Sequence, residues 1–87
     1  MEKGTKVYHL ILYRFGDTIE IIATDEKKGI AAVMKKYVQL YREQNNNENP
    51  HYAKNQYGES YYSAAKEDIE IREYEIDVVQ YYGKNYR

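Results

Sequence analysis

Apolar and polar residues alternate along the first part of the chain. Two runs rich in β-branched and aromatic residues, 6–15 and 18–23, are separated by Gly16-Asp17. Glycine readily adopts the positive φ that the tightest hairpin turns need, so the pattern predicts a β-hairpin. With Gly16-Asp17 as its loop, Leu12 is expected opposite Ile21.

The two faces of this predicted hairpin differ. One face is apolar at nearly every position and is expected to meet the core, because side chains alternate between the faces of a strand: Tyr8, Leu10, Leu12, Ile19, Ile21 and Ala23. The other face mixes polar, aromatic and aliphatic side chains: His9, Ile11, Tyr13, Phe15, Thr18, Glu20 and Ile22. This second face is too polar for a deep interior and too aromatic for an ordinary solvated surface.

Apolar residues then recur with the spacing of a helix. They fall at intervals of three and four: Ile30, Val33, Met34, Tyr37, Val38 and Tyr41. Thr24 or Asp25 can cap the first turn, so an amphipathic helix is predicted over about 25–43. Its opposite face is polar: Lys28, Lys35, Lys36, Gln39 and Arg42. Gly29 costs this helix about 1 kcal/mol relative to alanine unless another residue packs closely against it.

The second half of the chain is less regular. Residues 44–58 contain no aliphatic side chain larger than alanine and are rich in asparagine, which predicts a long, polar, mobile loop. Residues 61–68 are compatible with a short helix or a strand, whereas 69–82 predict a strand. The apolar positions of that strand change from odd to even numbers, and a bulge near Arg72-Glu73 would reconcile the two phases.

These elements predict one small α+β domain in the order ββαβ, in which an antiparallel sheet carries one amphipathic helix on one face. The chain has 87 residues, so it holds a single thin core. It has no cysteine, which excludes disulfides and thiolate metal sites and favours a cytoplasmic location. No apolar run is long enough for a spanning helix, so we expect no membrane partner.

Tyrosine is the outstanding compositional feature, with 12 residues against one phenylalanine and no tryptophan. Four tyrosines lie at positions where core packing is expected: Tyr8, Tyr37, Tyr41 and Tyr74. The other eight are expected on the surface: Tyr13, Tyr52, Tyr57, Tyr61, Tyr62, Tyr81, Tyr82 and Tyr86. A tyrosine offers a large apolar area at a low entropic cost, so the surface group is a candidate for binding.

Charge is unevenly distributed although the net charge is only -1. Residues 67–77 contain six carboxylates and one cation, Arg72. Beyond the predicted bulge, Glu73, Glu75 and Asp77 are expected to share an outward face. A solvated acidic strand that guards a sheet edge is the plain interpretation, and an anionic docking strand is the functional one.

Sequence motifs give no support for an enzyme. The glycines are isolated, so no phosphate-binding loop is present, and neither His9 nor His51 lies in a nucleophile frame. His51 and the carboxylates could act as hard metal ligands, but carboxylates on one strand face point outward and do not converge. We therefore expect no catalytic residue, metal or cofactor.

The remaining features favour a protein-binding module. The candidate partner-binding residues combine surface tyrosines with the acidic strand: Tyr57, Tyr61, Tyr62, Glu70, Glu73, Glu75, Asp77, Tyr81 and Tyr82. The expected partner is a larger protein with a basic groove, in which carboxylates take the place of phosphates. In size and composition the chain resembles compact phage-encoded proteins that block host defence nucleases, such as anti-CRISPR proteins. That resemblance implies an inhibitor of a nucleic-acid-handling defence enzyme.

Two other functions fit the composition. In a single-stranded nucleic-acid binder, bases would stack on the tyrosines beside basic residues: Lys35, Lys36, Arg42, Lys54, Lys84 and Arg87. The neighbouring acidic strand would repel phosphate, which makes nucleic acid the less favoured partner. In an oligomeric small-molecule binder or sponge, tyrosines would line a pocket between subunits, and a homo-oligomer would also cover the mixed hairpin face.

Overall fold

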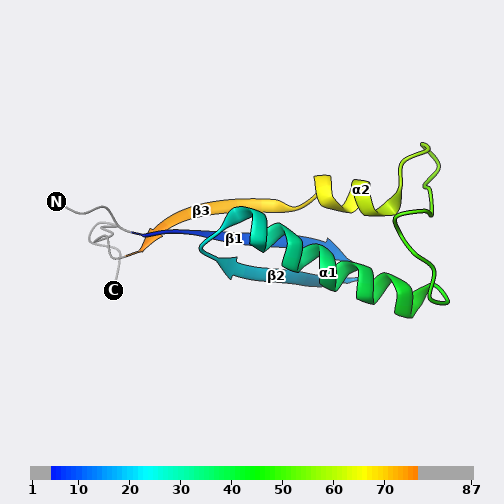
Figure 1. Cartoon of the computed structure of the whole chain (residues 1–87), viewed down its shortest axis with the longest axis horizontal. Helices are drawn as coiled ribbons and strands as arrows, with labels where there is room; N and C mark the ends of the chain where they lie inside the picture. The colour runs from blue at the N-terminus through cyan, green and yellow to red at the C-terminus, as the bar shows by residue number, and fades with distance from the viewer. Residues whose placement is uncertain (1–4, 77–87) are drawn as a thin grey trace.

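The computed structural model describes residues 5–76 and shows an α+β domain (Figure 1). Its elements are β1 Thr5–Arg14, β2 Asp17–Ala23, α1 Glu26–Gln44, α2 Tyr61–Glu67 and β3 Glu70–Ile76. The strands form an antiparallel sheet in the order β2-β1-β3, and α1 packs on one face of it. The predicted class is confirmed. The element order is ββααβ, because the segment that sequence left open forms the short helix α2.

The hairpin has the predicted faces but a different turn. Its loop is Phe15-Gly16, with φ values of 60° and 71°, so Leu12 pairs with Ile19 and the prediction that it faces Ile21 was wrong. The shift is two residues, which preserves the face of every strand side chain. Phe15 itself was expected on the mixed face. Its ring instead stacks on Tyr37 of α1 at 5.5 Å, a contact that helps to offset its left-handed backbone.

The predicted amphipathic helix is confirmed as α1. The Asp25 side chain accepts a hydrogen bond from the Lys28 amide and so satisfies one of the unpaired donors of the first turn. One side of α1 is buried against Leu10 and Leu12 of β1. A Cβ atom at Gly29 would lie 2.7 Å from Leu10 Cδ1, so close packing accounts for glycine inside this helix.

The polar segment between the helices is folded against α2. Its backbone forms a bridge between Lys54 and Ser60, and the Tyr62 amide donates to the carbonyl of the buried Pro50. The Ser60 hydroxyl caps α2 by accepting from the Ser63 amide. These bonds define the conformation of the segment, and its mobility stays a prediction.

Strand β3 pairs with β1 in one uninterrupted register from Glu70 to Ile76. The predicted bulge at Arg72-Glu73 is therefore wrong. The apolar phase changes for another reason: β1 and β3 continue past the start of α1, so no helix there requires an apolar partner (Figure 1). As a result Tyr74, opposite Val7, lies on the face away from α1 and is exposed rather than in the core.

Candidate functional site

The tyrosines proposed for binding lie at the end of the molecule that carries α2, in three different environments. Tyr57 is 78% exposed in the connecting segment. Tyr61 packs beside Tyr41 at a ring distance of 5.6 Å, and Tyr62 stacks on His51 at 3.9 Å and contacts the core. Only Tyr57 of these three offers most of its side chain to a partner. Tyr81 and Tyr82 lie outside the described residues.

The acidic side chains of β3 do not form one surface. Glu73 and Glu75 pair with Tyr8 and Lys6 and share the sheet face that carries α1, whereas Glu70 pairs with Ile11 on the opposite face. Asp77 lies outside the described residues. The predicted alignment of Glu73 with Glu75 holds, but they point to the helix side of the sheet.

Two of these carboxylates are engaged in ion pairs. Glu70 Oε2 lies 2.6 Å from Arg72, and Glu73 Oε2 lies 3.0 Å from Lys6 Nζ. The hydrogen bond from each cation to its carboxylate raises the pKa of Arg72 and of Lys6, so both stay charged at neutral pH. Pairing reduces the negative potential that these two carboxylates present to a partner.

The sheet face opposite α1 carries large exposed side chains. We call it the open face and define it by the residues of the three strands that point there: Thr5, Val7, His9, Ile11, Tyr13, Thr18, Glu20, Ile22, Glu70, Arg72 and Tyr74. Ile22 is 69% exposed, Tyr13 59% and Tyr74 49%. Tyr13 and Ile22 lie close to Ile11, which is only 5% exposed, whereas Tyr74 lies further along the face, opposite Val7. Both described helices pack on the other side of the sheet (Figure 1).

Polar and charged groups on the open face occur mainly as hydrogen-bonded pairs. His9 Nε2 lies 2.6 Å from Glu20 Oε1, and Arg72 binds Glu70. Each pair already satisfies much of the hydrogen-bonding capacity of its members, so a partner that covers this face desolvates few polar groups that lack a hydrogen-bond partner. Sequence analysis identified the hairpin half of this face, but missed Tyr74 because it placed β3 in the wrong phase.

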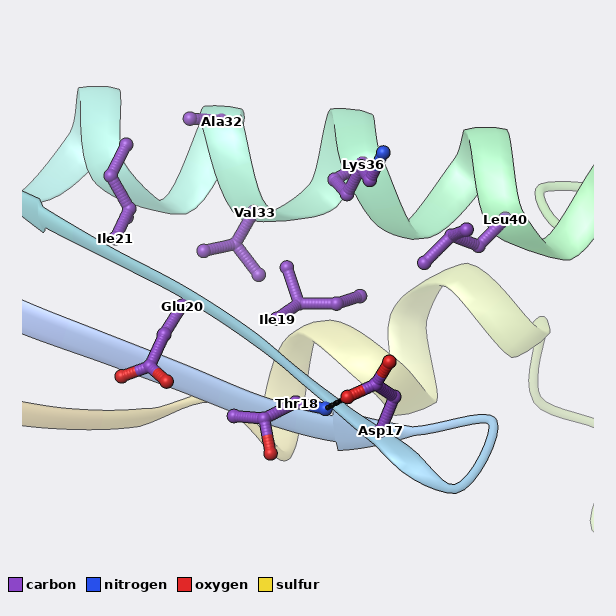
Figure 2. Close-up of a pocket in the computed structure, with 9 residues that line it drawn as sticks. All are labelled: Asp17, Thr18, Ile19, Glu20, Ile21, Ala32, Val33, Lys36 and Leu40. Carbon is purple, nitrogen blue, oxygen red and sulfur yellow. Dashed lines mark hydrogen bonds between the residues drawn. The ribbon is translucent and has the colours of Figure 1, made fainter.

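A groove lies on the other side of the sheet, between β2 and α1. It has a volume of about 570 Å³. Nine residues line it: Asp17, Thr18, Ile19, Glu20, Ile21, Ala32, Val33, Lys36 and Leu40. Figure 2 shows Ile19 and Ile21 pointing toward α1, and Glu20 and Thr18 pointing away from it. The groove is therefore apolar at its floor, with polar groups along its margins.

An aromatic ladder closes the core beside the hairpin turn. Phe15, Tyr37, Tyr41 and Tyr61 follow one another with ring distances of 5.5, 6.0 and 5.6 Å. The Tyr37 hydroxyl donates to the Tyr61 carbonyl at 3.3 Å, and burial raises the pKa of Tyr37 and Tyr41. These contacts show that the ladder packs α2 against α1 and stabilises the core.

Comparison with known proteins gives no family assignment. No protein-family model, curated protein or solved structure matches the chain. Within residues 5–76, no helix is long and apolar enough to cross a membrane. Functional inference for this protein therefore rests on its own surfaces.

Proposed function

We propose that this protein is a non-enzymatic protein-binding module whose main contact surface is the open face. The observation that supports this most strongly is the exposure of three large side chains on that face, Ile22, Tyr13 and Tyr74. Apolar area gains free energy when it leaves water, by about 25 cal/mol per Å². A face on which three large side chains stay about half exposed or more, beside polar groups that are hydrogen-bonded to one another, has the chemistry of a contact surface.

The residue types on the open face suit a protein partner. Isoleucine and tyrosine supply apolar contact area, and tyrosine and arginine each carry a polar group at the tip. Tyrosine and arginine are also enriched among residues that dominate binding energy. A sheet face also holds its side chains on a hydrogen-bonded backbone, so little conformational entropy is lost on association.

The finer proposal is an inhibitor of a nucleic-acid-handling enzyme, with a basic groove as the surface that it occupies. Charge separation supports this choice. Helix α1 carries five cations against two carboxylates, a net charge of +3. The described residues outside α1 carry five cations against ten carboxylates, a net charge of -5. An acidic body steers encounter with a basic surface, and its carboxylates compete there with phosphate.

Affinity capture with three forms of the protein tests the open face. The first is the wild type, and the second carries Tyr13→Thr, Ile22→Thr and Tyr74→Thr, since threonine is β-branched and favours a strand. The third is a matched control with Lys35→Ser and Gln39→Ser on the exposed side of α1. We expect the wild type and the control to enrich the same protein, identified by mass spectrometry, and the open-face variant to lose it. Equal capture by all three forms would contradict the proposal.

The inhibitor proposal needs a second experiment with the purified partner. A labelled oligonucleotide bound to that partner should be displaced by this protein, and the partner's activity on nucleic acid should fall in parallel. Direct binding of the oligonucleotide to this protein at low salt, with no protein partner captured, would instead indicate a nucleic-acid binder. Capture without displacement would retain the binding module and reject the basic groove.

A further inference from the structure

We infer that the groove between β2 and α1 is a second, separate binding site, which takes an extended peptide segment of a partner protein as a fourth strand beside β2. The proposal depends on three properties of the groove. Backbone groups at the outer edge of β2 pair with no other described strand, an apolar floor lies beside that edge, and one cationic side chain stands on the helical wall.

The hairpin register shows which backbone groups of β2 face outward. A two-residue loop is closed by a hydrogen-bonded pair, here Arg14 and Asp17, and such pairs alternate along an antiparallel ladder. Ile19 and Ile21 therefore bond to β1, whereas Thr18, Glu20 and Ile22 direct their amides and carbonyls to the edge. The Thr18 amide is satisfied by Asp17 Oδ1 at 2.8 Å, as Figure 2 shows. The outward amides of Glu20 and Ile22 are therefore the ones that an added strand can use.

The space beside this edge matches the side chains of an added strand. Residues of a strand alternate between its two faces, so every second side chain of the peptide would enter the groove. There it would meet Ile19 and Ile21 from the floor, and Val33 and Leu40 from the helix (Figure 2). A volume of about 570 Å³ accommodates several aliphatic side chains. Main-chain bonds would provide affinity, and this apolar lining would select the residue types.

The charged residues that line the groove predict a further feature of the peptide. Of the two carboxylates that line the groove, Asp17 binds the Thr18 amide, and Glu20 points away from α1 and binds His9 (Figure 2). Lys36 is the cation of the lining and stands on the helical wall. The groove therefore favours a segment with aliphatic residues at alternate positions and a carboxylate among those that face α1.

Display of a random peptide library on the immobilised full chain tests this site without assuming a sequence. We expect enriched peptides to alternate aliphatic residues and to carry an acidic residue in the same phase. Titration of one selected peptide should shift the amide resonances of Glu20 and Ile22 in the NMR spectrum more than those of β3. Failure of any peptide to enrich, or shifts confined to β3 or the connecting segment, would overturn the proposal.

Two substitutions of Ile22 distinguish peptide binding at the edge of β2 from binding at the open face. Ile22→Pro removes an outward amide without removing a bond to β1, and should weaken the selected peptide about tenfold, the effect of one lost interface hydrogen bond. Ile22→Thr keeps that amide and should bind within about threefold of wild type, well under one such bond, even though it impairs the open face.

Ala32→Trp fills the groove from an exposed helical position, so it should abolish peptide binding with the fold retained. Unchanged affinity in Ala32→Trp would overturn the proposal, as would a stable dimer by light scattering that excludes the peptide. A charge exchange completes the test: Lys36→Glu should reject the selected acidic peptide and accept the same peptide with lysine in place of its acidic residue. Equal affinity of Lys36→Glu for both peptides would remove the charge preference.

Discussion

The two faces of the central strand β1 bury neighbouring residues by different means. Leu10 and Leu12 are completely buried under α1, whereas Ile11, on the open face, is 5% exposed and lies outside the core cluster that α1 covers. On the first face the buried area is part of a helix and sheet core. On the second face the surrounding Ile22 and Tyr13 stay exposed. The comparison separates a face that stabilises the fold from a face that is available for contact.

The largest expected difference between the faces concerns β1 itself. Leu12→Ala should lower the free energy of unfolding by about 3 kcal/mol, because it removes buried methyl groups and leaves a cavity under α1. The adjacent Tyr13→Ala, on the open face, should cost less than about 1 kcal/mol. Urea denaturation followed by circular dichroism measures both. Similar losses in the free energy of unfolding for the two substitutions would contradict the claim that only the face under α1 stabilises the fold.

The second prediction follows from the close packing of Gly29 in α1 against Leu10 in β1. Gly29→Ala improves helix propensity by about 1 kcal/mol but forces Leu10 to move, so we expect a net loss of about 1 kcal/mol. Combining it with Leu10→Val should make the total loss smaller than the sum of the separate losses, since the shorter side chain makes room for the new methyl group. Additive losses in urea denaturation would show that Leu10 does not cause the strain.

Alkaline pH should destabilise the core between the sheet and α1. Burial raises the pKa of Tyr41 and Tyr37 in the folded state above the ordinary value of 10.0, so the unfolded chain releases these protons first. Their contribution to stability is complete below about pH 10 and is lost as the pH rises through the raised values. Tyr41→Phe should reduce the fall in urea midpoint between about pH 9 and pH 11. An unchanged fall in this variant would exclude Tyr41 as a source.

The smallest expected effect is on the stability of open-face variants. Tyr13→Thr and Ile22→Thr should each change the free energy of unfolding by about 0.5 kcal/mol or less, because both side chains are already largely exposed in the folded state. Thermal unfolding provides the measurement. A loss comparable to that of Leu12→Ala would show that these side chains stabilise the fold. Lost binding in open-face variants could then result from unfolding and would not identify a contact surface.

The fold was predictable where local patterns and tertiary packing agree. Alternation in the hairpin and the spacing of Val33, Met34 and Tyr37 each identified a buried face without knowledge of its partner. The exact turn was not predictable, because both possible loops contain Gly16 and preserve the faces. The choice of Phe15-Gly16 depends in part on a stack between Phe15 and Tyr37, which are distant in sequence.

The candidate site was predictable only in part, for a related reason. Sequence indicates that the hairpin has a mixed face, because that pattern is local. The position of Tyr74 depends on the pairing of β3 with β1 and on how far α1 extends over the sheet, which are both long-range properties. The groove also escaped sequence analysis, since it requires β2 at the edge of the sheet beside the Ala32 side of α1.

A photo-crosslinking comparison tests the central claim most directly. A benzophenone amino acid is placed at position 13 on the open face or at position 35 on the exposed side of α1, and each form is irradiated with cell lysate. We predict that the form with the label in place of Tyr13 crosslinks to one specific protein, and that excess unlabelled wild type competes for it. The form with the label in place of Lys35 should leave that protein uncrosslinked. Specific crosslinks from position 35 alone, or none that wild type competes for, would contradict the assignment of the open face as the binding surface.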